Sequence, residues 1–435
     1  MRVLLATIGS AGDTHPFIAV GKRLRARGHE VFMAANPHFH PRIRDAGLEP
    51  IALGEEAELL RVLMDPRLAN QRQSPYLVLE ELFNNSIEPS FEALRRAVRE
   101  IRPDAIVRHH ILPAARWVGE LEGVPVATVA LTPSMWFAKG EPMILRSHIP
   151  DWLQQALSPV IRQAGRLALR WLVDRPVNRA RLRLGLPPMR DVLATEARSG
   201  ARVLGLWSSH FRPPRSGDPA NSHVCGYTFF DRATPADRTL DPALERFLDR
   251  HEQTGRGVIA FTLGTAIVHH APQFFEHAAR VARRLERAVV LLTGSLGEGH
   301  TPVGQSLARR TQDDPLVFVH PYAPHSLLMP RAAASVHHAG AGSSGQALRS
   351  GRPSLSVPFV NDEFDIAWRL QRLGVAQTLP AERVDEQRLA DALSTLLRST
   401  ECAERARRIG QLVQAEDGAD RAAAEIEAMV SARSA

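Results

Sequence analysis

The 435-residue chain is poor in several residue types, and each scarcity excludes a class of protein. Only two cysteines are present, Cys225 and Cys402, which excludes a disulfide framework and a cysteine-rich zinc site. No apolar run approaches the roughly 18 to 20 residues of a membrane helix. Residues 1–8 are too short an apolar stretch for a signal peptide and lack a basic leader, so we expect a cytoplasmic protein. With 44% hydrophobic and 23% charged residues, the composition excludes collagen-like, coiled-coil and largely disordered chains.

Lysine is nearly absent. The 54 basic residues include only Lys22 and Lys139, so 52 arginines set the formal charge of +7 and the pI near 10.2. A basic surface suits nucleic acid or an anionic membrane, but arginines spread over solvated helix faces give the same composition. No RNA-binding aromatic ladder, zinc finger or basic zipper occurs, so we expect no nucleic-acid partner. A peripheral contact with an anionic membrane stays open because arginines gather in one insert: Arg162, Arg166, Arg170, Arg175, Arg179, Arg181 and Arg183.

The order of apolar runs predicts two α/β domains. Residues 3–8 form a buried-strand pattern, followed by a glycine-containing turn, a helix from Pro16 to about residue 26 and a second strand at 31–35. Further strands are expected at 105–107, 126–130, 203–207, 223–227, 258–263, 288–293, 316–319, 333–337 and 354–357. The proline-rich stretch 211–241 is the best linker candidate.

We therefore expect two Rossmann-like, doubly wound parallel-sheet domains that face a central cleft. Residues 1–230 form the first domain and residues 231–417 the second. The tail after about residue 401 is expected to be helical, and residues 418–435 are candidates to pack back on the first domain.

The richest motif is the segment 336–348, in which a short strand leads into a glycine-rich turn and then a helix. Free backbone N–H groups, the helix dipole and two hydroxyls would converge on one point, which suits a pyrophosphate. His338 could add a donor, or a positive charge if an anion raises its pKa. A tight turn with a satisfied histidine is the alternative.

Other motifs are missing. Gly9 and Gly12 do not complete G-x-G-x-x-G, and the strand at 31–35 ends without an acidic residue for a ribose, so a nicotinamide or flavin enzyme is not expected. The chain has no D-x-D, H-E-x-x-H or G-x-S-x-G. A metal-bridged diphosphate, a zinc protease and a serine hydrolase therefore lack support.

The segment 336–376, with its His-His-Ala-Gly-Ala-Gly-Ser-Ser run and its Asn361-Asp362-Glu363, resembles the donor signature of nucleotide-sugar-dependent glycosyltransferases. The opening, residues 8–17, is similar to the bacterial branch that contains sterol, macrolide, glycopeptide and rhamnolipid glycosyltransferases. Residues 65–68 and 322–324 also fit that branch. The resemblance spans both halves and implies the GT-B fold of the UDP-glycosyltransferase superfamily.

The resemblance implies an inverting, metal-independent transfer without a cofactor, in which a base deprotonates an acceptor hydroxyl. The base histidine of the plant branch aligns with Asp13. An ordinary Asp has a pKa near 4, so the site would have to raise it. The alternatives are that Asp13 only caps the helix or that His15 is the base. The acidic partner of the plant histidine is replaced by His109, which could hydrogen-bond Asp13 or relay its proton; a satisfied histidine at a strand end is the alternative.

For the donor, the resemblance implies binding by both halves of the chain. The expected residues are Ser10, Gly12, Gly264, Thr265, Tyr322, Ala323, His325, His338, Gly340, Gly342, Ser343, Ser344, Gln346, Asp362 and Glu363. Gln346 stands where a ribose contact lies, and Asp362-Glu363 replaces the Asp-Gln that holds sugar hydroxyls. Because Glu only accepts where Gln also donates, the sugar stays open, as do uridine and thymidine diphosphates.

The expected acceptor is a hydrophobic small molecule such as a polyketide, sterol, carotenoid or hydroxylated lipid. Phe83, Met135, Trp136 and Phe137 are its candidate contacts. A monomer or a dimer is expected. Two other functions compete: a nucleotide-sugar 2-epimerase on the same fold, and a non-catalytic glycosyltransferase-like auxiliary protein.

Overall fold

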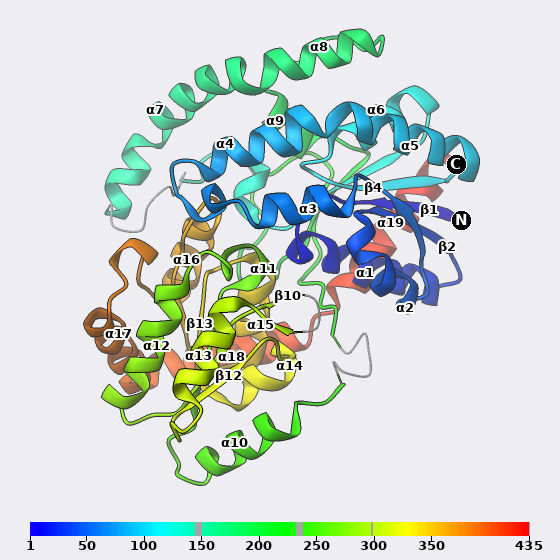
Figure 1. The fold of residues 1–435 in the computed structure, drawn as a ribbon. Coiled ribbons are helices and arrows are strands. Elements are labelled where there is room, and N and C mark those ends of the chain that lie inside the picture. Colours follow the sequence, from blue (N-terminus) through cyan, green and yellow to red (C-terminus); the bar gives the residue numbers. More distant parts are fainter. Residues whose placement is uncertain (143, 145–149, 232–237, 297–298, 435) are drawn as a thin grey trace.

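The computed structural model describes residues 1–142, 144, 150–231, 238–296 and 299–434. It contains two α/β domains stacked one on the other (Figure 1), each built around a parallel sheet. This arrangement confirms the predicted fold class. No helix among the described residues is long and apolar enough to cross a membrane.

The N-terminal sheet, as far as the chain is described, has the order β3-β2-β1-β4-β5-β6-β7, and all its pairings are parallel. Its strands are β1 (Arg2–Ala6), β2 (Glu30–Ala35), β3 (Glu49–Ala52), β4 (Ala105–His109), β5 (Val126–Ala130), β6 (Arg202–Gly205) and β7 (Ser222–Val224). Its helices are α1 (Ala11–Ala26), α2 (His40–Asp45), α3 (Glu56–Leu63), α4 (Ser74–Val78), α5 (Ile87–Ile101), α6 (Pro113–Glu122), α7 (Asp151–Leu169), α8 (Arg175–Arg183) and α9 (Val192–Arg198). Strands β4 and β5 are buried along their whole length, as expected for a sheet covered on both faces.

The C-terminal sheet has the order β12-β9-β8-β13-β14-β15 within the described residues and is also parallel. Its strands are β8 (Val258–Thr262), β9 (Val289–Leu292), β12 (Val317–His320), β13 (Ala332–His337), β14 (Ser354–Ser356) and β15 (Ala376–Thr378); β10 (Ser295–Leu296) and β11 (Gly299–His300) form a separate antiparallel pair. The helices are α10 (Pro242–Glu252), α11 (Gly264–Ile267), α12 (Pro272–Arg284), α13 (Pro302–Thr311), α14 (His325–Leu328), α15 (Ala341–Ser350), α16 (Glu363–Arg372), α17 (Glu386–Arg398), α18 (Thr400–Gln414) and α19 (Gly418–Ser434).

Helix α1 begins five residues earlier than its sequence predicted, at Ala11 rather than at Pro16. The Ser10 hydroxyl accepts from the Gly12 N–H, and Asp13 accepts from the Ser10 N–H, so the two side chains form a reciprocal cap. Proline removes one backbone donor, but the helix continues through it. The earlier start puts Asp13 in the first turn of α1.

The two domains are joined by two crossings of the chain. The stretch after β7 and the junction between α18 and α19 pass at Gly226 and Gly418, where a Cβ on Gly418 would lie 2.4 Å from the Gly226 carbonyl oxygen. Helix α19 then packs on α1 and adds Ala422, Ala423, Ile426 and Met429 to the core of the N-terminal domain.

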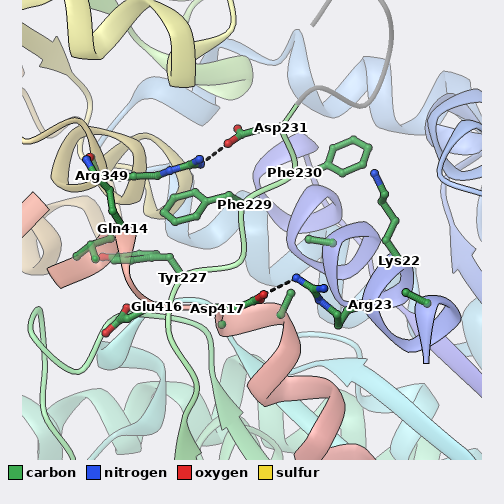
Figure 2. A pocket seen from close by; sticks show the side chains of 15 residues that line it. Lys22, Arg23, Tyr227, Phe229, Phe230, Asp231, Arg349, Gln414, Glu416 and Asp417 are labelled. Carbon is green, nitrogen blue, oxygen red and sulfur yellow. Dashed lines mark hydrogen bonds and ion pairs between the residues drawn. The ribbon is translucent and has the colours of Figure 1, made fainter. Parts of the chain in front are cut away.

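A cavity of about 500 Å³ lies beside these crossings (Figure 2), between α1, the linker and the start of α19. Its charged side chains are paired across the junction: Arg349 with Asp231, and Arg23 with Asp417. Lys22 lies over the ring of Phe230 at 5.9 Å. These contacts tie the linker to both domains.

Candidate functional site

A cavity of about 1090 Å³ lies between the domains, at the carboxyl ends of their strands. Ligands of open parallel sheets bind at this edge. Residues from both halves of the chain line it. Of the residues singled out in the sequence, the lining includes Ser10, Gly12, Asp13, His15, His109, Met135, Phe137, Gly264, Thr265, Tyr322, His325, His338, Gly340, Gly342, Ser343, Gln346, Asp362 and Glu363.

The Asp13 carboxyl group is held at the wall of this cavity by the cap of α1. Its Oδ2 accepts from the Ser10 N–H at 2.8 Å and from the Ser10 hydroxyl at 3.1 Å. Burial raises the pKa of Asp13 to about 6; the Ser10 hydrogen bonds oppose that rise, and the negative charge of Asp362 adds to it. The capping role and a chemical role are therefore compatible, since Oδ1 makes no capping bond.

His109 lies opposite that remaining oxygen. Its Nε2 is 3.6 Å from Asp13 Oδ1, at the end of β4, which pairs with β1. The Ile111 N–H donates to His109 Nδ1 at 3.4 Å, so the ring proton belongs on Nε2 and points toward Asp13. Burial lowers the pKa of His109 well below its usual value, and His110 and Arg108 lower it further. The ring is thus neutral, and its Nε2–H faces the carboxylate from just beyond hydrogen-bond distance.

His15, the alternative base, also lines the cavity but has a different partner. Its Nε2 lies 2.8 Å from a guanidinium nitrogen of Arg42, and its ring packs against Phe230 at 5.1 Å. Because Arg42 can only donate, that contact uses the lone pair with which His15 would take a proton. The geometry favours Asp13.

The glycine-rich turn accommodates the ring of His338. A Cβ on Gly340 would lie 2.2 Å from His338 Nε2, and a Cβ on Gly264 would lie 2.5 Å from Cε1 of the same ring. The two glycines therefore leave the space that this ring occupies. Burial and the neighbouring His325 lower the pKa of His338 to about 4, and its buried Nδ1 has no partner.

Helix α15 begins directly after this ring, and its N-cap Gly340 offers no side-chain cap. Gly342 and Ser343 lie in the uncapped first turn and line the cavity. Backbone N–H groups at such a helix start attract anions. The ring of His338 and the first turn of α15 together make a site suited to a phosphate group.

The side chain of Gln346 is oriented by a residue that the sequence analysis missed. Asp231, at the end of the linker, accepts from Gln346 Nε2 at 2.7 Å and pairs with Arg349. Asp231 also lines the cavity. The sequence around Asp231, which follows two phenylalanines, did not indicate a site residue, because the partners of Asp231 lie more than a hundred residues away.

Asp362 and Glu363 meet the N-terminal domain across the cavity. Asp362 accepts from the Thr132 side chain, and burial raises its pKa. Glu363 Oε2 accepts from the Phe359 and Val360 N–H groups at 2.7 and 3.0 Å, while burial raises the pKa of Glu363 well above its usual value. One carboxyl oxygen of Glu363 is therefore hydrogen-bonded to the backbone of the preceding loop, residues 359–360.

Four of the predicted residues do not contribute a described side chain to the lining. Ala323 and Ser344 are buried behind it, and the Ser344 hydroxyl has no partner. Trp136 is fully buried against Trp207, at 4.5 Å between ring centroids. The side chain of Phe83 lies outside the described residues.

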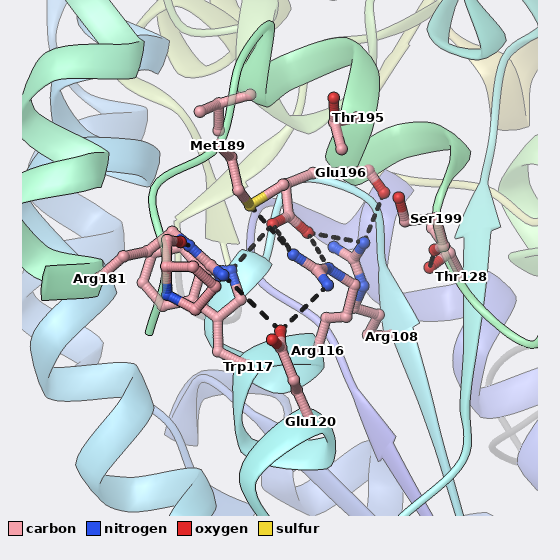
Figure 3. A network of polar contacts seen from close by, with 12 residues as sticks. Arg108, Arg116, Trp117, Glu120, Thr128, Arg181, Met189, Thr195, Glu196 and Ser199 are labelled. Carbon is pink, nitrogen blue, oxygen red and sulfur yellow. Dashed lines mark hydrogen bonds and ion pairs between the residues drawn. The ribbon is translucent and has the colours of Figure 1, made fainter. Parts of the chain in front are cut away.

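Behind the strand that carries His109 lies a buried ionic network (Figure 3). Glu196 accepts from Arg116 and from Trp117 Nε1 and pairs with Arg108 at 3.0 Å. Burial alone would raise the pKa of Glu196, but the two arginines hold it below its usual value. Arg108 also donates to the carbonyl of His110 at 3.2 Å. The network thus braces the turn that follows β4.

Much of the cavity lining is apolar, and the N-terminal domain supplies a large part of it. Its apolar lining residues include Met135, Phe137, Leu68, Leu79, Leu131, Leu169 and Leu193. Among the described residues, no group of three or more His, Cys, Asp or Glu is arranged to hold a metal ion.

Comparison with known proteins is consistent along the whole chain. Residues 3–115 match the glycosyltransferase family 28 N-terminal domain, and residues 314–430 match the erythromycin biosynthesis protein CIII-like C-terminal domain. O-mycaminosyltylonolide 6-deoxyallosyltransferase of Streptomyces fradiae is 32% identical over 100% of this chain and 98% of its own length.

Solved structures share the fold. The glycosyltransferase of kitacinnamycin has a TM-score of 0.73 at 22% identity, covering 99% of both chains. Glycosyltransferase VinC, solved in complex with DTDP, has a TM-score of 0.68 at 20% identity and covers 99% of this chain and 100% of its own. The matches along both halves confirm the resemblance found in the sequence: the chain is a GT-B glycosyltransferase of the UDP-glycosyltransferase superfamily, of the macrolide and natural-product type that transfers sugars to small-molecule acceptors.

Proposed function

We propose that this enzyme transfers a hexose from a UDP- or dTDP-sugar to a hydroxyl of a hydrophobic acceptor, with inversion, without a metal ion, and with Asp13 as the general base. The observation that carries the proposal is the position of Asp13 in the shared cavity, with one carboxyl oxygen uncapped and a pKa of about 6. A base with that pKa is mostly ionised at pH 7 and still holds a proton better than an ordinary Asp.

On the acceptor side, Asp13 Oδ1 takes the hydroxyl proton while the oxygen attacks the anomeric carbon. The His109 N–H faces the same carboxyl oxygen from 3.6 Å without a hydrogen bond, and it would stabilise the charged form when the two groups close in the substrate complex. His109 acts as a positioning residue in this proposal. A proton relay through it would require a cationic imidazole, which the low pKa of His109 disfavours.

On the donor side, the diphosphate would bind at the first turn of α15. The N–H groups of Gly342 and Ser343 and the ring of His338 would stabilise the charge that develops as the glycosidic bond to phosphate breaks. An anion there would raise the pKa of His338 from its low value, so protonation of the ring would accompany donor binding.

Inversion is supported by the placement of these groups on different domains. Asp13 and His109 belong to the N-terminal sheet, whereas α15 follows β13 of the C-terminal sheet. A sugar between them would have its leaving group toward one wall and its attacking hydroxyl toward the other. In-line displacement from opposite sides inverts the anomeric carbon.

Asp362 and Glu363 are the proposed contacts of the sugar hydroxyls. Both carboxyl groups line the cavity, and Asp362 is close enough to Asp13 to raise its pKa. Glu363 has one oxygen committed to backbone N–H groups, which leaves the other for the sugar. The raised pKa of Glu363 favours a protonated carboxyl, which can donate a hydrogen bond as Gln does.

The apolar lining that the N-terminal domain supplies supports a hydrophobic acceptor, and a macrolide-like polyketide is the class that the Streptomyces fradiae relative suggests by its name. The DTDP bound to VinC favours a thymidine diphosphate donor over a uridine one.

The test is to incubate the pure enzyme with α-linked dTDP- and UDP-hexoses, with and without macrolide aglycones, and to determine products by NMR. We expect a β-glycoside that forms only when acceptor is present. An epimerised nucleotide sugar from donor alone would assign the chain to the epimerases. Nucleotide binding without any transfer across the acceptor panel would assign it to the auxiliary proteins.

A further inference from the structure

Helix α7 buries polar side chains and exposes large apolar ones, which is the reverse of an ordinary surface helix. Its buried positions include the polar residues Gln154 and Ser158, which are 2% and 6% exposed. Large apolar side chains face outward instead: Trp152 is 70% exposed, Val160 66% and Leu167 54%. An exposed apolar stripe of this size on a soluble domain marks a surface that binds something.

The outward apolar residues form one continuous face. At about 100° per residue, the exposed large apolar side chains of α7 fall within an arc of about 140°, opposite the buried positions. These are Trp152, Leu157, Val160 and Leu167, and the same arc holds the exposed Ala156, Ala164 and Gln163. Trp171 and Leu172 are exposed in the π-helical turn that follows, residues 170–174. Helices α7 and α8 lie along the outer edge of the N-terminal domain, and the first turns of α7 reach toward the C-terminal domain (Figure 1).

The charge beside this stripe is mostly positive. From residue 152 to residue 190 the only acidic side chain is Asp174, which is buried and accepts from the Asp191 and Val192 N–H groups. The exposed charged residues described in that stretch are Arg170, Arg175, Arg179, Arg183 and Arg190. The Arg175 guanidinium lies 3.1 Å from the centroid of the exposed Trp171 ring.

We propose that the outward face of α7 and the arginines that follow it dock this enzyme on an anionic lipid surface. A helix that lies in a membrane interface needs an apolar face, a basic flank and tryptophans near the headgroups, and α7 has all three. Charge complementarity selects anionic lipid, since four exposed arginines, Arg170, Arg175, Arg179 and Arg190, have no ion pair within the described part of the chain, and of the exposed arginines here Arg183 alone pairs with a carboxylate, Glu88.

The helix that carries the docked face also borders the cavity. Leu169, the last residue of α7, lies on the side of the helix opposite the docked face and lines the cavity together with Leu193 of α9. A hydrophobic acceptor dissolved in the membrane would therefore meet the enzyme next to its binding site. This last step rests on the proposed acceptor class, whereas the membrane contact does not.

The test is co-sedimentation of the purified full chain with vesicles of phosphatidylcholine alone or mixed with phosphatidylglycerol. We expect binding only to the anionic vesicles, and weaker binding as salt is raised. Leu167→Glu should reduce the partition coefficient about tenfold or more, because it puts a charge into the apolar face. Leu412→Glu is the matched control, since Leu412 is an exposed leucine on α18 of the other domain.

The arginines are tested separately. Arg170→Gln with Arg179→Gln should weaken binding by about 25-fold, at about fivefold for each charge near the surface. Arg250→Gln with Arg309→Gln removes the same charge from exposed positions on α10 and α13 and should change binding little. Thermal unfolding and transfer to a soluble acceptor show that each variant is folded.

Three outcomes would overturn the proposal: no vesicle binding, equal binding to zwitterionic vesicles, or equal loss in the control variants. A dimer that Leu167→Glu dissociates would assign the stripe to a second copy of the chain and would also overturn it. Failure of the transfer assay alone would count against the proposed function and not against the membrane contact.

Discussion

The two domains place a pair of histidines at equivalent positions and use them differently. His109-His110 ends β4, which lies beside the first strand of its sheet, and His337-His338 follows the same pattern at β13 beside β8. In both pairs the first histidine accepts, through Nδ1, the N–H two residues further along. In both, Nε2 of that histidine is buried without a hydrogen-bond partner.

The residues around each pair account for the difference. The turn directly after β4, residues 110–112, has no glycine, and the first histidine faces Asp13. After β13 the chain has Gly340, and the second histidine occupies the space that this glycine leaves. A strand end of the same design thus serves the proposed base in one domain and the proposed phosphate site in the other.

The largest expected effect concerns Asp13, the carboxylate that faces the histidine pair of the N-terminal domain. Asp13→Asn keeps the size of the side chain and removes the base, so kcat should fall by about 10²- to 10⁴-fold. Binding of the nucleoside diphosphate, measured by calorimetry, should stay within about twofold because the phosphate site lies on the other domain. Unchanged turnover would exclude Asp13 as the base.

A second difference is the residue before each pair, which is Arg108 in one domain and Val336 in the other. Arg108→Met removes a cation from the buried network and should cost about 3–5 kcal/mol of unfolding free energy. The double variant Arg108→Met/Glu196→Leu should regain part of that loss, since it also removes the carboxylate. Denaturant unfolding measures both, and a single variant as stable as the parent would show that the network contributes nothing.

Gly340 leaves the space that the His338 ring occupies, and replacing this glycine tests that packing. Gly340→Ala should destabilise the ligand-free protein by about 1–3 kcal/mol, because its Cβ would lie 2.2 Å from the ring. The backbone φ of Gly340 is −66°, so an alanine is not strained there and the effect is steric. Gly342→Ala, two residues on, has open space around its Cβ and should change stability by less than about 0.5 kcal/mol. Equal effects would contradict the packing argument.

The smallest effect concerns pH. Because the pKa of Asp13 is raised to about 6, the carboxyl gains a proton as pH falls through 6, and kcat/KM should fall tenfold per unit below it. In the proposed mechanism the His109 N–H hydrogen-bonds the charged carboxylate during the reaction, a contact worth about 0.5–1 kcal/mol, so His109→Phe should move this limb up by about half a pH unit. His337→Phe should leave the limb in place. An unchanged limb in both variants would remove His109 from the proposed mechanism.

The fold was predictable because its strands are buried on both faces and appear as continuous apolar runs. The strands missed are the short β10–β11 pair and, in the two sheets, β3 and β15, short edge strands that contain Pro50 and Gln377 respectively. The early start of α1 was missed because Pro16 looked like a first-turn proline, whereas Ser10 and Asp13 cap the helix further upstream.

The candidate site was partly predictable for a topological reason. Asp13 and His109 follow adjacent parallel strands, so their positions after β1 and β4 bring them together. Asp231 and Glu196 could not be found in this way, because their roles depend on partners far along the chain. Their assigned roles, like those of the other site residues, stay predictions until the variants are measured.

Helix α19 has a consequence for how the protein forms. The last helix of the chain supplies Ala422, Ala423, Ile426 and Met429 to the core of the first domain, and its Glu427 pairs with Arg27 and His29. During synthesis the first domain leaves the ribosome about two hundred residues before this helix does, with part of its apolar surface still uncovered. The N-terminal domain therefore completes its core last although it is made first, and a nascent chain or a truncated gene product would expose that surface to chaperones.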